Sequence, residues 1–98
     1  MPSVARLGDM CTGHGTWPPR NCTSGSPNVF VNGIAVHRQG DSWSPHTQIV
    51  KPYETHASTL ASGSSTVFVN GKQMGRIGDP VACGSVVAQG SSNVFAGG

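Results

Sequence analysis

Charged residues are scarce in this chain: they make up 10% of its 98 residues, against about 25% in an ordinary globular domain. Hydrophobic residues are also few, at 36%, so the core must be small. The six Lys and Arg residues are scattered and the net charge is +2, which leaves no basic stripe that could follow a phosphate backbone. We therefore expect no nucleic-acid partner.

Long hydrophobic runs are missing as well. No stretch reaches the roughly 18 apolar residues of a membrane-spanning helix, and the start, MPSVARLGDM, lacks the apolar segment of a secretory signal. We expect a soluble chain with no signal peptide, made in the cytoplasm or exported by a route that cleaves no leader. The length predicts a single domain, residues 1–98.

Cysteine is limited to three residues, Cys11, Cys22 and Cys83. An odd number excludes a fully paired disulfide framework in a monomer, which disfavours a disulfide-stapled secreted module. Cys11 and Cys22 could still form one disulfide, Cys11 could replace another metal ligand, or both could be small buried hydrophobic residues. In a reducing cytoplasm we favour the last interpretation.

Glycine and repetition are what the sequence has in abundance. There are 14 Gly and 7 Pro, which favours turns and short strands over helix. A ten-residue stretch occurs as SGSPNVFVNG at 24–33, as SGSSTVFVNG at 62–71 and as QGSSNVFAGG at 89–98. The first two copies agree at eight of ten positions. Such self-similarity indicates a repeat architecture.

Each copy has the pattern of a short β-hairpin. The segments 29–31, 67–69 and 94–96 are rich in Val and Phe, and Asn-Gly, a strong hairpin-turn signal, follows the first two. The return strands end in Gly-Asp, and the start of the chain, VARLGD, matches the end of such a strand. The third hairpin is therefore divided between the termini, and we expect the strand around Phe95 to pair with that around Val4.

The three units align beyond their hairpins. The aligned charged residues are Arg6, Arg38 and Arg76, and Asp9, Asp41 and Asp79. We predict an all-β fold of three pseudo-symmetric hairpins with little or no helix. The connecting segments at 10–24, 42–62 and 80–89 contain prolines that oppose helix, and we expect them to be irregular loops that converge on one end of the fold.

Three side chains that can bind metal occupy equivalent places in the three units. His14 and His46 lie five residues after the aligned aspartate, and Cys83 lies four residues after it. Around a three-fold axis these side chains would face one another, and His56, in the longest loop, is the remaining candidate for a fourth ligand. Three His nitrogens and one Cys thiolate are typical of tetrahedral zinc, and His-rich sites also accept iron.

The other notable side chains are interpreted as structural. His37 lies where the next unit has Gly75, and we expect it on a strand surface. The aligned aspartates are expected to accept hydrogen bonds from downstream backbone N–H groups in Asx-turns. We expect one apolar layer about the axis from Phe30, Phe68 and Phe95, and caps on a thin core from Trp17 and Trp43.

One ordered set of motifs spans essentially the whole chain. It consists of the MPSVARLGD start, GH soon after it, GSPNVFVNG followed by GD, then GSSTVFVNGKQMGRIGDPVACG and a closing GSSNVF. The set resembles the PAAR-repeat family. That resemblance implies a short, sharp β-cone of three repeats with zinc near its point. It also implies that the zinc ligands are His14, His46, His56 and Cys83.

Members of that family cap the trimeric β-helical spike of contractile injection machines, in phage tails and in type VI secretion systems. The resemblance implies a non-enzymatic spike tip with one structural Zn²⁺. Its partner would be the blunt end of a VgrG-like or phage central spike, with one chain per trimer and a transient encounter with the target membrane. Its location would be the tip of a virion tail, or the bacterial cytoplasm before secretion through the apparatus.

A small zinc hydrolase is the alternative function. In it, His14, His46 and His56 would hold the metal and a water molecule would take the fourth position. This alternative predicts that Cys83 is dispensable and that the site is open to substrate.

Overall fold

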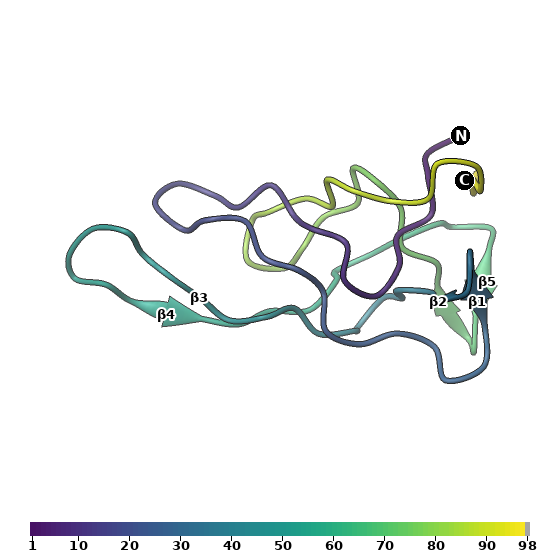
Figure 1. Cartoon of the computed structure of the whole chain (residues 1–98), viewed down its shortest axis with the longest axis horizontal. Coiled ribbons are helices and arrows are strands. Elements are labelled where there is room, and N and C mark those ends of the chain that lie inside the picture. The colour runs from purple at the N-terminus through teal and green to yellow at the C-terminus, as the bar shows by residue number, and fades with distance from the viewer. Residues whose placement is uncertain (98) are drawn as a thin grey trace.

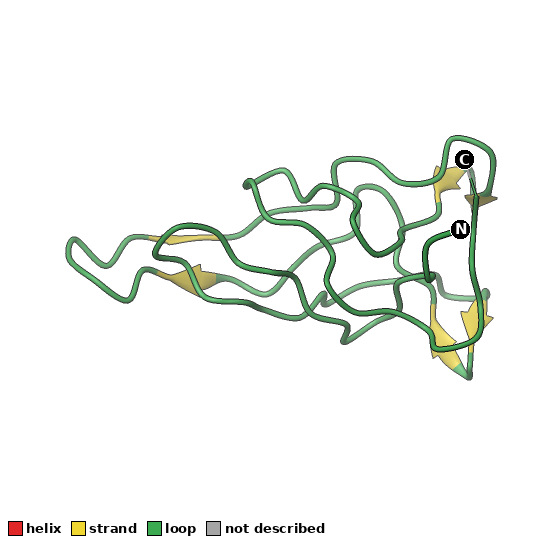
Figure 2. Ribbon diagram, turned by 90° about the horizontal axis from the view of Figure 1, so that it is seen from above, coloured by secondary structure: helices red, strands yellow, loops and turns green. Residues whose placement is uncertain are grey.

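The computed structural model describes residues 1–97, and six two-residue strands in it form antiparallel pairs. β1 (Phe30–Val31) pairs with β2 (Ile34–Ala35), β3 (His46–Thr47) with β4 (Thr55–His56), and β5 (Phe68–Val69) with β6 (Lys72–Gln73). Turns, bends and isolated bridges join the pairs, without any helix among the described residues (Figure 2). Residues 1–97 thus hold no helix that could span a membrane.

The molecule is wide at one end and narrow at the other (Figure 1). Its principal extents are 40 × 24 × 22 Å. The N-terminus and the β1–β2 and β5–β6 hairpins lie at the wide end, which we call the base, while the β3–β4 hairpin projects from the narrow end, the apex. The small all-β fold expected from the sequence is confirmed.

The two Asn-Gly hairpins form as predicted. In the β1–β2 turn, Asn32 and Gly33 have φ of 56° and 75°, and the equivalent Asn70 and Gly71 have φ of 54° and 78°. Positive φ at both central residues matches the right-handed twist of the flanking strands, which is why Asn-Gly is favoured there. The third hairpin closes across the termini: Ser3 bridges Phe95. The predicted pairing of the two chain ends is confirmed.

Three equivalent residues form a closed ring of backbone hydrogen bonds across the molecule. Ala5 N–H donates to the Gly75 carbonyl at 2.8 Å, Gly75 N–H to the His37 carbonyl at 2.9 Å, and His37 N–H to the Ala5 carbonyl at 3.0 Å. The ring follows the pseudo-three-fold relation of the units. Two small clusters make up the core. One comprises Val4, Val31, Val36, Val69 and Ala96, and the other Ala5, Cys11, Cys22, Trp43, Leu60, Val81 and Val87.

The expectation that His37 lies on the surface is wrong, because its side chain is 0% exposed. The matching positions hold Ala5 and Gly75, and this leaves room for one large side chain. A Cβ at Gly75 would approach Leu60 Cδ2 to 2.9 Å and His37 Cδ2 to 3.4 Å. The small residues at the two equivalent positions therefore leave space for the buried imidazole of His37.

The predicted apolar layer of phenylalanines is also wrong. Phe30, Phe68 and Phe95 are 57%, 56% and 50% exposed. Side chains alternate along a strand, so the neighbouring Val31 and Val69 point inward and are buried. Smaller side chains fit close to the axis, and the three phenylalanines remain on the surface of the base.

The aligned aspartates accept hydrogen bonds from upstream, not from downstream as expected. Asp41 Oδ2 accepts the Arg38 backbone N–H at 2.8 Å, and its two oxygens accept Nε–H and Nη2–H of the same arginine at 2.9 Å. Arg6–Asp9 and Arg76–Asp79 repeat this arrangement. An arginine and an aspartate three residues apart thus clamp the end of each return strand.

The segment 42–62 is not wholly irregular, since it contains the β3–β4 hairpin. His46 pairs with His56, and Thr47 with Thr55, whose hydroxyl oxygens are 2.6 Å apart. Pro45 and Pro52 lie outside the paired residues, where they exclude helix without interrupting the strands.

Candidate metal centre

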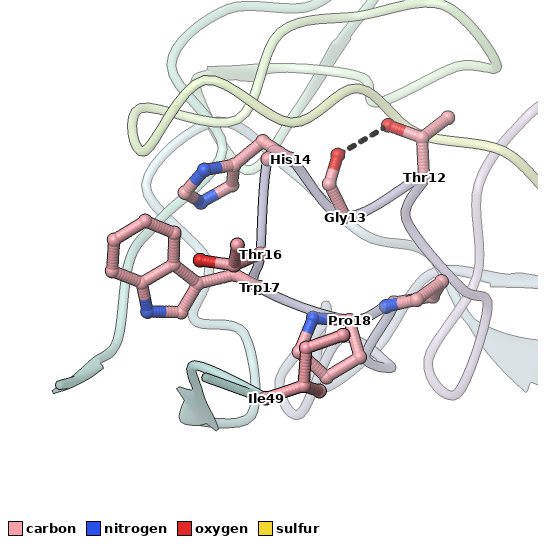
Figure 3. A pocket seen from close by; sticks show the side chains of 9 residues that line it. Thr12, Gly13, His14, Thr16, Trp17, Pro18 and Ile49 are labelled. Atoms are coloured by element: carbon pink, nitrogen blue, oxygen red, sulfur yellow. Dashed lines mark hydrogen bonds between the residues drawn. The ribbon is translucent and has the colours of Figure 1, made fainter. Parts of the chain in front are cut away.

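The first loop at the apex presents His14 from a tight turn. His14 N–H donates to the Trp17 carbonyl at 3.0 Å, and Trp17 N–H donates to the His14 carbonyl at 2.8 Å. This reciprocal pair closes residues 14–17 and leaves the imidazole beside the indole (Figure 3). Gly13 permits the turn with φ of 72°, and a Cβ there would come within 2.6 Å of the Trp17 carbonyl oxygen.

The second loop contributes two histidines through strand pairing. Residues directly opposite each other in an antiparallel pair have side chains on the same face. Because His46 is registered with His56, both imidazoles lie on one face of the β3–β4 hairpin. The longest loop thus supplies two side chains to the centre.

The third loop brings Cys83. Its turn is held by Val81 N–H donating to the Ser85 carbonyl at 2.8 Å and by Gly84 N–H donating to the Val81 carbonyl at 2.9 Å. Gly84 has φ of 108°, a conformation that favours glycine. Cys83 is partly buried and packs against the core cluster that contains Cys11, Trp43 and Leu60.

These four side chains meet. One ligand atom from each of His14, His46, His56 and Cys83 lies within 4.8 Å of all the others. His56 Nε2 is 3.0 Å from His14 Nε2 and 2.6 Å from His46 Nε2. Zinc–nitrogen bonds of about 2.0–2.1 Å in a tetrahedron would separate two nitrogens by about 3.3 Å, so small movements would fit the group around one ion. The structure therefore brings together all four of the residues singled out in the sequence, in a group that could hold a metal ion.

Two contacts orient the imidazoles. His46 Nδ1 lies 2.8 Å from the Pro18 carbonyl, which can only accept, so Nδ1 carries the proton and Nε2 keeps its lone pair toward the group. Trp17 stacks on His14 with ring centroids 5.1 Å apart and lies 4.8 Å from the ring of His56. Its Nε1–H donates to the Glu54 carbonyl at 3.1 Å, which ties the first loop to the β3–β4 hairpin.

Sequence reasoning did not find these supporting roles. Trp17 was expected to cap the core, yet it packs on the histidines, while Trp43 is 4% exposed within the core. The only available signal was that Trp17 lies three residues after His14.

Electrostatics favour neutral imidazoles. Burial, followed by repulsion from His46, lowers the pKa of His14. Burial, followed by repulsion from His46 and His14, lowers the pKa of His56. Neutral imidazole is the form that binds metal, so both side chains are suited to coordination at neutral pH.

The other two cysteines lie outside the group. Cys11 and Cys22 are free and buried, as the favoured interpretation predicted. Cys22 Sγ–H donates to the Arg6 carbonyl at 3.0 Å, and burial raises the pKa of this thiol to about 11. Cys11 Sγ accepts the Arg20 backbone N–H at 3.4 Å. Both act as small core residues with one polar contact.

A hollow of about 470 Å³ lies beside the His14 turn, lined by residues 12–19 and by Ile49 of the β3–β4 hairpin (Figure 3). No titratable side chain except His14 lines it. It offers no general base to accompany a bound metal.

Comparison with known families gives a direct assignment. The model of the family described as PAAR motif matches residues 12–89 and again residues 55–98. No curated protein matches the chain. The two family matches together run over most of the sequence, including all four residues of the His and Cys group. The chain belongs to the PAAR motif family.

Proposed function

We propose that this chain is a structural, metal-binding tip that caps and sharpens the trimeric β-helical spike of a contractile injection machine, such as a phage tail or a type VI secretion system. The observation that carries the proposal is the combination of a pseudo-three-fold base with a single asymmetric group of His14, His46, His56 and Cys83 near the opposite end. The base of a single chain would thereby match a three-fold partner, while the apex of the same chain would form a single point.

The base has the properties of a docking surface. Phe30, Phe68 and Phe95 are all at least half exposed and come from equivalent strands. Three equivalent apolar side chains suit the blunt end of a true trimer, on which each would meet the same subunit surface. We propose one chain per trimer of a VgrG-like or phage central spike.

The donor set fits zinc. The three His nitrogens and the Cys thiolate would fill all four positions of a tetrahedral ion, which is the pattern of structural zinc sites, and iron is the other metal to test. Bound there, the ion would add a common link to three loops that already share hydrogen bonds, such as Ile49 N–H to the Thr16 carbonyl and Thr12 N–H to the Val86 carbonyl. A three-histidine hydrolase would keep one position for water, whereas Cys83 lies within the group.

The location follows from this function. The chain would act at the tip of a virion tail, or would be made in the bacterial cytoplasm and leave with the spike, meeting the target membrane during penetration.

Elemental analysis of the purified chain is the first experiment. We expect about one zinc per chain in the wild type and a marked loss in Cys83→Ser. Cys11→Ser is the matched control, because Cys11 is a buried thiol outside the group, and it should keep its metal. Full zinc retention by Cys83→Ser would contradict the four-ligand site and favour the hydrolase. The variant Glu54→Gln would then test whether the Glu54 carboxylate is its general base. Absence of metal from the wild type would overturn the metal-binding tip.

A further inference from the structure

The outermost part of the apex is apolar. In the turn between β3 and β4, Ile49, Val50 and Tyr53 are 71%, 46% and 54% exposed. This turn is the extreme point of the molecule along its longest axis (Figure 1). Three large hydrophobic side chains within five residues thus face solvent where the chain would first meet a target.

The fold holds this turn in place. Tyr53 N–H donates to the Val50 carbonyl at 2.9 Å, and Gln48 N–H donates to the Glu54 carbonyl at 2.9 Å. Ile49 N–H donates to the Thr16 carbonyl of the first loop at 3.0 Å. The apolar side chains are therefore displayed on a braced hairpin whose stem carries His46 and His56.

This patch is separate from the base. The exposed phenylalanines lie on the hairpins of the wide end, while Ile49, Val50 and Tyr53 lie at the opposite end of a molecule 40 Å long. Binding of the base to a spike would leave the apex uncovered. The two apolar surfaces therefore need different partners.

Two of the three charged side chains in the apical loops are cations, and the turn between β3 and β4 carries one charge of each sign, Lys51 and Glu54. The connecting segments 10–24, 42–62 and 80–89 contain Arg20 and Lys51 as cations and Glu54 as their single acid. Lys51 lies within the apolar turn itself. A lysine can extend its ammonium toward phosphate groups while its methylenes stay among apolar atoms.

We propose that Ile49, Val50 and Tyr53 insert into the interface of a phospholipid bilayer, with Lys51 on anionic headgroups. A convex point offers no groove for a peptide, but it can enter the headgroup region, where apolar side chains gain burial and a tyrosine keeps its hydroxyl hydrated. The inference deepens the proposed function and rests on it, because a spike tip is what would bring this turn to a membrane. The turn would anchor the point on lipid before force is applied.

Vesicle binding tests this directly. The whole zinc-loaded chain is mixed with vesicles of phosphatidylglycerol and phosphatidylethanolamine, and the partition coefficient is measured by co-sedimentation. The double variant Ile49→Ser/Val50→Ser should partition about tenfold more weakly, because two exposed apolar side chains are lost while the braced backbone remains. Lys51→Ala should weaken binding by roughly fivefold on these vesicles and have no effect on vesicles of phosphatidylcholine alone.

The matched control removes exposed apolar side chains from the base instead of the apex. Phe30 and Phe68 are exposed to a similar extent, so Phe30→Ser/Phe68→Ser deletes comparable apolar area from the base. This control should bind vesicles as the wild type does. The inference would be overturned if Phe30→Ser/Phe68→Ser lost vesicle binding while Ile49→Ser/Val50→Ser kept it, because the base would then be the lipid-binding surface.

Two further outcomes would overturn it. Wild-type protein that does not partition has no lipid-binding apex. Self-association that disappears in Ile49→Ser/Val50→Ser, without vesicle binding, would assign the patch to a second copy of the chain. The metal content of the same samples separates the two proposals: a zinc-loaded chain that ignores vesicles contradicts only this inference, and a metal-free chain that binds vesicles contradicts only the metal-binding tip.

Discussion

The base and the apex are stabilised in different ways. At the base a serine of each unit donates to the hairpin of another unit. In two of the units the acceptor is an asparagine: Ser26 Oγ–H donates to Asn70 Oδ1 at 2.7 Å and Ser91 Oγ–H to Asn32 Oδ1 at 2.6 Å. In the second unit Ser64 Oγ–H donates to the carbonyl of Gly97 at 2.5 Å, so a backbone oxygen replaces the asparagine that the third copy lacks. The base is therefore built from one kind of contact, repeated between units that are distant in sequence.

The apex has no such repetition. Its three loops differ in length and supply different residues: His14 from a four-residue turn, His46 and His56 from one hairpin, and Cys83 from another turn. Repetition suits a surface that must meet a three-fold partner, whereas a single ion on the axis needs four ligands from three units. The comparison predicts that a metal ion would matter mainly to the apex.

Removal of metal should produce the largest effect. Structural zinc contributes strongly to the folding of small domains, and a loss of about 5 kcal/mol would lower Tm by about 20–40 °C in a domain of this size. Differential scanning calorimetry with and without a chelator measures this. Hydrogen exchange on the same samples should show faster exchange at His46 and His56 than in β1 and β5. Equal acceleration at both ends would show that the base depends on the metal as much as the apex does.

Crowding at the hydrogen-bonded ring of Ala5, His37 and Gly75 should give the next largest effect. Gly75→Ala would place a Cβ 2.9 Å from the His37 carbonyl oxygen and 2.9 Å from Leu60 Cδ2. Overpacking of this kind costs about 1–3 kcal/mol, which urea denaturation of the metal-loaded protein can measure. In the control, Gly97→Ala, the new Cβ would meet only the flexible Met1 side chain, at 3.3 Å or more. A Gly75→Ala variant as stable as the control would show that the ring has room to relax.

The same residues show what the sequence could reveal and what it could not. The Asn-Gly hairpins and the pairing of the chain ends were predictable because their signals are local or repeated. The meeting of His14, His46 and Cys83 was predictable because equivalent positions converge on a three-fold axis. His56 was only the candidate left in the longest loop, and its place follows from the pairing of β3 with β4. Burial of His37 was not, because it depends on the absence of a side chain at Gly75, which is distant in sequence. The stacking of Trp17 on His14 and His56 depends on how two loops of different units meet.

The indole of Trp17 gives a smaller effect at the apex. Trp17→Ala removes the ring that stacks on His14 and the Nε1–H that bonds the Glu54 carbonyl. Groups that orient metal ligands typically change metal affinity by about 10–100-fold, and we expect the lower end for a contact without a hydrogen bond to the imidazole. Competition with a zinc-binding dye measures the affinity. Trp17→Phe keeps a stacking ring and should retain most of the zinc affinity. Equal affinities of Trp17→Ala and the wild type would show that Trp17 does not support the metal centre.

The smallest expected effect concerns His37, the buried titratable group of the axis. Its Nδ1 must carry a proton, because it bonds the Ser24 carbonyl at 2.9 Å, while its Nε2 has no partner within residues 1–97. Burial lowers the pKa of His37; the Ser24 carbonyl and the charges of Asp41 and Asp9 partly oppose this, and Arg38 adds to it. Protonation would bury an unpaired charge, so the neutral imidazole belongs to the folded state.

The sign of the pH dependence follows. A histidine whose folded pKa lies below the unfolded value of about 6.5 contributes stability that is fully present above that value and is lost as pH falls toward the folded pKa. His37→Asn keeps a donor for the Ser24 carbonyl but cannot titrate, so its stability should fall less steeply below pH of about 6.5. Both proteins share His14, His46 and His56, so the difference between their slopes isolates His37. Parallel slopes would mean that His37 does not contribute to the pH dependence, which would then come from other groups such as the histidines of the apex or the three aspartates paired with arginine.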